Sequence, residues 1–263
     1  MNEYAFVLAG FFVGIVVGLT GVGGGSLMTP LLIFGFGIKP HLAIGTDLLF
    51  AAFTKMGGTV SLARSRLVDW RIVGQVATGS IPASLVTLYV LEHVGPANSA
   101  LQSVMTTTLG VALLLTAIAT LYKALRGKAA PVHISAEHLT QATTARHWSL
   151  PVLFGAIIGT LVTLTSVGAG AIGVTVLMLL YPALPLPRIV AADIAHAVPL
   201  TLVAGLGHAS IGSVDWPLLV KLLAGSLPGI WLGTYLMHKT PDRVIRSLLS
   251  VLLAYAGVKL ISI

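Results

Sequence analysis

The sequence predicts an all-α, polytopic integral membrane protein built from two inverted repeats. Its composition predicts the membrane class, because 56% of the 263 residues are hydrophobic and only 9% are charged. Soluble globular domains carry about 25% charged residues, so a surface this poor in charge needs lipid as its solvent. Rare residues that recur along the chain predict the repeats, and the positions of the basic loops predict their inversion.

The repeat has an offset of 146 residues, seen most clearly where Asp69-Trp70 recurs as Asp215-Trp216. At that offset Asp47 falls on Asp193. Two further matches, the second with one residue of slippage, pair 79–82 with 225–228 and the glycine-containing run 20–25 with 165–170. Repeats of this kind indicate one structural unit built twice.

Each half contains five apolar segments. In the first half they are 4–20, 24–37, 41–63, 71–91 and 98–122. In the second half they are 149–166, 168–182, 189–211, 216–237 and 243–262. Helices of roughly 17–25 apolar residues cross a bilayer, whereas the second segment of each half is short and follows a glycine cluster. We therefore expect about eight spanning helices plus broken or re-entrant segments.

Basic residues are concentrated in three loops, which the positive-inside rule places in the cytoplasm. Their members are Arg64, Arg66 and Arg71; Lys123 to Arg146; and Lys239, Arg243 and Arg246. The second Asp-Trp loop, 213–216, has no basic residue and is expected outside. Equivalent loops then lie on opposite faces, so the repeats are inverted and both termini are external.

The stretch 123–148 is a long polar region in an otherwise apolar chain, and it indicates a linker between the halves. We expect an N-terminal membrane repeat at 1–122, a cytoplasmic linker at 123–148 and a C-terminal membrane repeat at 149–263. The first four residues lack the basic region of a signal peptide, so the first segment is expected to be retained. The absence of cysteine excludes disulfides and thiolate metal sites.

Two patterns that suggest other functions are set aside. The excess of 15 Lys and Arg over 8 Asp and Glu is explained by the basic loops, so no nucleic acid partner is expected. The run 168–173 fits a dinucleotide fingerprint with Asp193 downstream, but that motif has meaning only within a soluble βαβ unit. No Gly-Lys-Ser or Gly-Lys-Thr occurs, which argues against ATP-driven pumping. We expect no cofactor.

Several motifs together resemble the TauE/SafE sulfite exporter family, also called TSUP, over nearly the whole chain. The runs that carry the resemblance are 18–26 with Pro30, 44–47, 68–70, 212–216 and 225–229. The chain departs from the family pattern at Asp47, where many members have a small polar residue, and at 191–193, where Ala-Ala-Asp replaces Gly-Thr. The resemblance implies movement of sulfite, organosulfonates or related small anions across a bacterial inner membrane.

The glycine clusters are the first candidate for a substrate site. Glycine lets the chain break inside the membrane, and the freed N–H groups at the next helix start, with the positive end of its dipole, can hold an anion. The alternative is close helix packing through small residues. The candidate residues are Thr20, Gly23, Gly24, Gly25, Ser26, Thr165, Ser166, Gly168 and Gly170.

Lys55 is the second candidate, as an anion contact, because an ionisable residue inside a membrane is costly and marks a functional site. The alternatives are a lysine that reaches the interface or one that pairs with Asp47 to hold helices together. Eight residues of straight helix span about 12 Å, so direct pairing with Asp47 is not expected. The equivalent residue in the second half is Thr201, so the site would be asymmetric.

Asp47, Asp193, His196 and His208 are candidates for proton coupling. An acid beside an anion site favours its protonated form, although helix N-capping is an equal alternative for both acids. His196 and His208 are twelve residues apart on one segment, about 18 Å, so no metal site is expected. Proton relay and core histidine both remain open for them.

The residues favour a secondary transporter or facilitator, and the resemblance implies that it exports small sulfur-containing anions across the inner membrane. Export of one negative charge gains roughly 2.3 kcal/mol per 100 mV, so even a uniporter would work. The alternatives are a proton-coupled carrier of another small organic anion, a membrane-embedded enzyme and a structural subunit. An enzyme would need converging nucleophile, base and cofactor groups, and a structural subunit would not need buried charges. A small anion and the lipid bilayer are the expected partners.

Overall fold

The computed structural model describes residues 3–20, 25–95, 98–126, 148–168, 170–236 and 242–262. The first half contains α1 (Glu3–Thr20), α2 (Gly25–Pro30), η1 (Leu31–Gly35), α3 (Pro40–Arg64), α4 (Trp70–Val94) and α5 (Ser99–Arg126). The second half contains α7 (Ser149–Thr165), α8 (Ala171–Leu180), α9 (Leu186–Ser210), α10 (Trp216–Leu236) and α11 (Asp242–Ile261). Every regular element in these ranges is a helix, so the all-α class is confirmed.

Four helices in the described ranges are long and apolar enough to cross a membrane. They are Trp70–Val94, Ser99–Tyr122, Leu186–Ser210 and Trp216–Leu236. The helices α3 and α11, with 25 and 20 residues, also reach spanning length at about 1.5 Å per residue. These lengths confirm a polytopic helical membrane protein, while the total of eight spanning helices stays a prediction.

The helix after each glycine cluster is short, as the sequence predicts. The helices α2 and η1 have 6 and 5 residues, and α8 has 10. Ten residues of helix extend about 15 Å, half of the hydrocarbon core of a bilayer. Pro30 ends α2 because proline has no N–H to continue the α-helical bonding, and the chain proceeds through a wider π-helical turn.

The predicted linker begins later than expected. The helix α5 continues to Arg126, so residues 123–126 are helical rather than part of the linker. A basic side chain is compatible with the last turn of a membrane helix, because its apolar stem stays in lipid while its charge reaches the interface. Most of the predicted linker, residues 127–147, lies outside the described residues.

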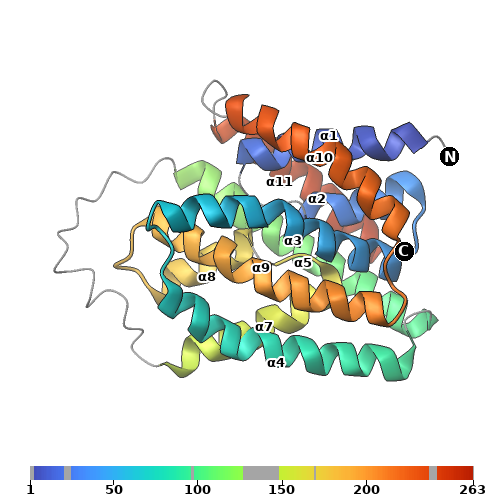
Figure 1. Cartoon of the computed structure of the whole chain (residues 1–263), viewed down its shortest axis with the longest axis horizontal. Helices are drawn as coiled ribbons and strands as arrows, with labels where there is room; N and C mark the ends of the chain where they lie inside the picture. Colours follow the sequence, from blue (N-terminus) through green and yellow to red (C-terminus); the bar gives the residue numbers. More distant parts are fainter. Residues whose placement is uncertain are drawn as a thin grey trace.

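The helices of the two halves pair in a symmetric pattern. In chain order, the counterparts are α1 and α7, α3 and α9, α4 and α10, and α5 and α11. The pair α1–α10 corresponds to α7–α4, and both run side by side along their lengths (Figure 1). The counterparts α3 and α9 pack on each other through the middle of the bundle, and so do α5 and α11. Two equivalent units explain this pattern, and their opposite orientation in a membrane stays a prediction.

Glycine ladders bring the paired helix backbones into contact. A Cβ on any ladder glycine would overlap a backbone carbonyl of the facing helix. The α1–α10 ladder consists of Gly10, Gly14, Gly18, Gly225, Gly229 and Gly233, and the α4–α7 ladder consists of Gly79, Gly155 and Gly159. Small residues at such spacing let membrane helices approach closely without a hydrophobic driving force. The ladders therefore hold two helix pairs together, α1 with α10 and α4 with α7, around α3 and α9.

We expect Gly229→Ala to lower the unfolding temperature of the purified protein in detergent. A Cβ at Gly229 would overlap the carbonyl oxygen of Phe11 on α1, so the two helices must separate, and overpacking of this kind costs about 1–3 kcal/mol. Gly74→Ala is the matched control, because nothing lies within 4 Å of its Cβ position on α4. There alanine should stabilise the helix by roughly 0.5–1 kcal/mol. Equal unfolding temperatures for the two variants would contradict the ladder.

The inverted orientation predicts that Ser65 and Ser210 are open to opposite sides of the membrane. Ser65 follows α3, Ser210 ends its counterpart α9, and both are exposed, whereas Ser213 is fully buried and unsuitable as a probe. The chain has no cysteine, so Ser65→Cys and Ser210→Cys are each the single labelling site. A membrane-impermeant maleimide should reach Ser65→Cys from the cytoplasm and Ser210→Cys from outside. Labelling of both from one side would rule out inversion.

Candidate functional site

The central helices α3 and α9 each carry a buried acid. Asp47 on α3 is fully buried, and Asp193 on α9 is 3% exposed. Lys55, on α3, is partly exposed, and its ammonium charge interacts most with Asp193 and also with Asp47. Charges within a membrane protein are costly and pair with one another, which gives these three residues a reason to lie together. They form one electrostatic cluster, named here the Lys55 cluster.

Asp193 lies against the beginning of α8. Its Oδ1 occupies the place that a Cβ at Gly173 would take, so only glycine fits beside this carboxylate. Gly173 belongs to the first turn of α8, where helical N–H groups have no intrahelical partner and the helix dipole is positive. The position predicted for a bound anion, at the start of this short helix, is therefore next to a carboxylate of the protein itself.

His196 extends the Lys55 cluster toward α4. It follows Asp193 by three positions on α9, which places both on one face of the helix. Its Nε2 is 2.8 Å from Oγ of Ser80 on α4, and the ring is 4% exposed. The charge of Lys55 also acts on this imidazole. A titratable ring, an acid and a lysine thus lie within electrostatic range of one another.

His208 has a different environment. Its Nε2 is 2.9 Å from the carbonyl oxygen of Thr163 on α7, so this nitrogen donates the hydrogen bond. The side chain is 1% exposed, and the hydrogen bond links α9 to the last turn of α7. The contact is that of a histidine that holds two helices together, and it gives His208 no link to Lys55.

Asp47 is surrounded by hydroxyl groups rather than by an imidazole. Thr29 on α2 donates a hydrogen bond to its Oδ2, and the hydroxyl of Ser166 also acts on the carboxylate. Ser166 caps the C-terminus of α7 in the left-handed conformation, with φ of 60°. The two symmetry-related acids therefore have different chemical surroundings, although their sequence positions are equivalent.

The first glycine break is partly described. Thr20 ends α1 and Gly25 begins α2, while Gly23 and Gly24 lie outside the described residues. Ser26 is 7% exposed, so its side chain is directed into the bundle. An anion contact from these residues stays a prediction.

The second glycine break has a well-defined local geometry. The single hydroxyl proton of Thr165 is within donating distance of the carbonyl oxygens of Leu161 and Val167, at 2.6 and 3.0 Å, and the Val167 N–H donates to the same hydroxyl. Gly168 and Gly170 have φ values of +134° and +131°, which residues with a side chain rarely adopt. These glycines shape the turn from α7 to α8, and the hydroxyl of Thr165 is engaged within that turn.

Sequence reasoning missed three residues that the structure places at the candidate titratable groups: Thr29 at Asp47, Ser80 at His196 and Gly173 at Asp193. Thr29 directly precedes Pro30 in the first glycine motif, and Ser80 belongs to a run that recurs in the second half. These positions offered a weak signal. Hydroxyls and glycines are common in membrane helices, so only the contacts across helices distinguish these three from the rest.

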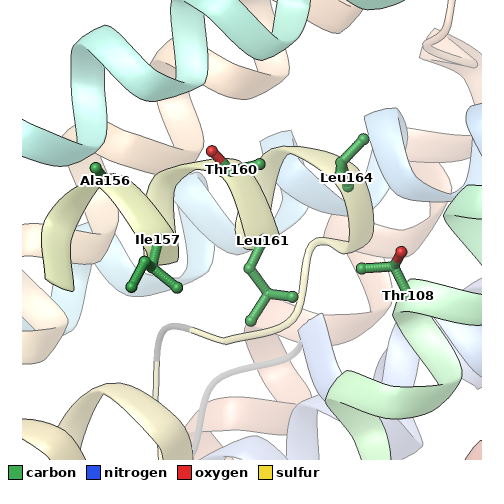
Figure 2. A pocket seen from close by; sticks show the side chains of 6 residues that line it. All are labelled: Thr108, Ala156, Ile157, Thr160, Leu161 and Leu164. Atoms are coloured by element: carbon green, nitrogen blue, oxygen red, sulfur yellow. The ribbon is translucent and has the colours of Figure 1, made fainter. Parts of the chain in front are cut away.

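A cavity of about 470 Å³ lies away from the Lys55 cluster, beside α7 (Figure 2). It is lined by Thr108, Ala156, Ile157, Thr160, Leu161 and Leu164. Ile157 and Thr160 are exposed, so the cavity opens on the outer surface of the bundle, where a bilayer supplies lipid. Two hydroxyls among apolar side chains cannot replace the hydration of an anion, so this cavity is not the substrate site.

Comparisons with known proteins agree along the whole chain. The profile of the family described as Sulfite exporter TauE/SafE matches residues 6–260. The Probable membrane transporter protein YjnA of Bacillus subtilis is 36% identical over 258 residues, covering 98% of this chain and 99% of the relative. Two further relatives from the same organism are also named probable membrane transporter proteins. YdhB is 29% identical, over 97% of this chain and 98% of the relative. YunE is 26% identical, over 99% of this chain and 98% of the relative.

No solved structure matches the chain. The family match extends over nearly all described helices, and the buried acids on α3 and α9 fit a protein that moves a charged solute through a membrane. The chain therefore belongs to the sulfite exporter TauE/SafE family and is a membrane transporter.

Proposed function

We propose that this transporter carries small sulfur-containing anions, such as sulfite or an organosulfonate, with Lys55 as the positive charge that binds them. The observation that supports this most is the position of Lys55, partly exposed between helices whose acids are buried. An anion that leaves water needs replacement donors and a balancing charge. Lys55 supplies both, and the description of the family names sulfite as the transported anion.

In this proposal, the carboxylate of Asp193 balances the positive charge of Lys55 when no anion is bound. An anion bound at Lys55 is a second negative charge beside Asp193. Protonation of Asp193 removes the repulsion between the anion and this carboxylate. The proton and the anion therefore favour each other's binding. His196, three positions after Asp193, hydrogen-bonded to Ser80 and within range of Lys55, is a titratable group placed to exchange that proton.

Export across the bacterial inner membrane is the proposed direction. The interior of the cell is electrically negative, so each net negative charge that leaves gains roughly 2.3 kcal/mol per 100 mV. The basic loops that set the orientation do not by themselves determine direction. Membrane potential is the argument, and it applies only to a complex with net negative charge: a divalent anion carried with one proton keeps one negative charge, whereas a monovalent anion carried with one proton is neutral and gains nothing from the potential.

Counterflow in proteoliposomes tests the substrate class. Vesicles that contain the purified protein and labelled isethionate should exchange it for external sulfite or isethionate faster than for lactate or chloride. Exchange with lactate alone would instead support the alternative, a carrier of another small organic anion. Vesicles that exchange none of these anions, with protein correctly inserted, would contradict the proposal.

A further inference from the structure

A second polar site lies where α2, α3 and the C-terminal end of α7 meet. Thr29 of α2 donates a hydrogen bond to Asp47 of α3, and the hydroxyl of Ser166, at the end of α7, is a polar neighbour of the same carboxylate. Residues from both halves of the chain thus converge on one buried acid. We propose that Asp47, Thr29 and Ser166 bind a monovalent metal cation, Na⁺ by the chemistry of the donors.

By hydrogen-bond geometry, Oδ1 of Asp47 and Oγ of Ser166 have no partner among the described residues, although the Ser166 hydroxyl lies close enough to act on the Asp47 carboxylate. Asp47 is fully buried and Ser166 is 6% exposed, so water does not readily satisfy them. A buried polar atom without a partner costs about 1–3 kcal/mol, and more when it is charged. A cation between the carboxylate and the hydroxyl uses the lone pairs of both oxygens at once.

The end of α7 adds negative charge at the same place. The last four carbonyl groups of a helix have no intrahelical partner, and the helix dipole gives this end about half a negative charge. The carbonyls of Val162 and Thr163 accept hydrogen bonds from the Ser166 N–H and from His208. A carboxylate beside a helix C-terminus favours a cation, and such helix ends coordinate Na⁺ in transporters with broken helices.

The charge and the donor types select the ion. Lys55 acts on both Asp193 and Asp47, so its single positive charge is shared between two carboxylates. The available ligands are a carboxylate and two hydroxyls, and oxygen ligands suit hard cations. One carboxylate balances a single positive charge. If the proposed anion site at Lys55 also holds, Na⁺ on Asp47 frees Lys55 for the anion, and the two ions should bind cooperatively.

The test measures sodium binding by the purified full chain in detergent, with no anion substrate present. NaCl replaces choline chloride stepwise at constant ionic strength while the unfolding temperature is followed. A ligand that binds only the folded state stabilises it by mass action, so the unfolding temperature should rise with NaCl and not with choline chloride. Asp47→Asn, Thr29→Val and Ser166→Gly should raise the half-saturating NaCl on the order of tenfold each, which corresponds to about 1.4 kcal/mol.

The variants are chosen so that each removes one donor. Thr29→Val keeps the branched side chain, and Ser166→Gly keeps the left-handed backbone while it removes the hydroxyl. Thr116→Val is the matched control, because this buried threonine donates to the carbonyl of Ala112 in its own helix rather than to Asp47. It should leave the sodium response unchanged. If Asp47→Asn does not fold, the two hydroxyl variants decide the question.

Three results would overturn the sodium site. The first is that sodium does not specifically stabilise the parent protein. The second is that the hydroxyl variants respond to sodium as the parent does. The third is that acid, and not sodium, stabilises the parent, and that Asp47→Asn loses this effect. The last result would assign a proton to Asp47. Lys55→Gln should still respond to sodium, with a lower half-saturating NaCl because Asp47 loses a positive neighbour, so failure of the anion proposal and failure of the sodium proposal are separate outcomes.

Discussion

Lys55→Gln is expected to weaken sulfite binding by roughly ten- to a hundredfold, because a hydrogen bond to a charged group contributes about 1.5–3 kcal/mol. Glutamine keeps a hydrogen-bond donor of similar length but removes the positive charge. The acids then lose their balancing charge as well, which further disfavours a second anion beside Asp193. A neutral analogue of the substrate should bind the variant about as well as the parent, because its affinity does not depend on that charge.

The matched control for this variant is Lys39→Gln. Lys39 is exposed just before α3, so the substitution removes the same charge from the same part of the chain without touching the Lys55 cluster. Titration of each purified protein with sulfite by calorimetry gives the two affinities directly. If Lys55→Gln folds and binds sulfite as tightly as Lys39→Gln, the anion site lies elsewhere, and the segment around His196 becomes the next candidate.

The helix boundaries were largely predictable from the sequence. The segment expected at 41–63 is α3 at Pro40–Arg64, and the one expected at 216–237 is α10 at Trp216–Leu236. Apolar runs of spanning length end at charged residues, glycine or proline, and lipid enforces those ends because unpaired backbone groups are not tolerated there. The end of α5 was misplaced because Lys123 and Arg126 suggested a loop, whereas a membrane helix carries such residues in its final turn.

The charged members of the site were predictable as well, but their grouping was not. Lys55, Asp47 and Asp193 stand out because ionisable residues are rare in apolar segments. The separation of Lys55 from Asp47 along α3 argued against pairing of these two residues. The sequence does not show that Asp193, from the opposite half, is the main electrostatic partner of Lys55. That contact depends on the packing of α3 against α9, which only the three-dimensional structure reveals.

The glycine clusters illustrate a second limit. Their recurrence predicted a break before each short helix, and the structure has short helices there. The sequence also suggested that the N–H groups after the break face an anion. The structure brings the carboxylate of Asp193 against Gly173 in the first turn of α8, and an anion at these N–H groups stays a prediction. A pattern of small residues predicts that a backbone can be approached closely, but it does not identify the group that approaches.

Asp193→Asn is expected to abolish flux driven by a pH gradient while anion exchange continues. Asparagine has nearly the same shape but cannot exchange a proton, and it leaves Lys55 with one fewer negative neighbour. Exchange needs only the loaded carrier, so it should survive the substitution. Isethionate is the suitable probe because its sulfonate keeps one charge across the neutral pH range, whereas sulfite itself changes protonation there.

Asp47→Asn separates this role from the proposed sodium site. It removes an equivalent carboxylate from the other half of the repeat, but one whose neighbours are Thr29 and Ser166 rather than His196. We therefore expect Asp47→Asn to keep the response of isethionate flux to a pH gradient and Asp193→Asn to lose it. Binding of isethionate to the parent should tighten as the pH falls, because a proton on Asp193 and an anion on Lys55 favour each other, and Asp193→Asn should bind with little dependence on pH. Equal pH dependence in the parent and in Asp193→Asn would reduce this acid to a structural partner of Gly173 and α8.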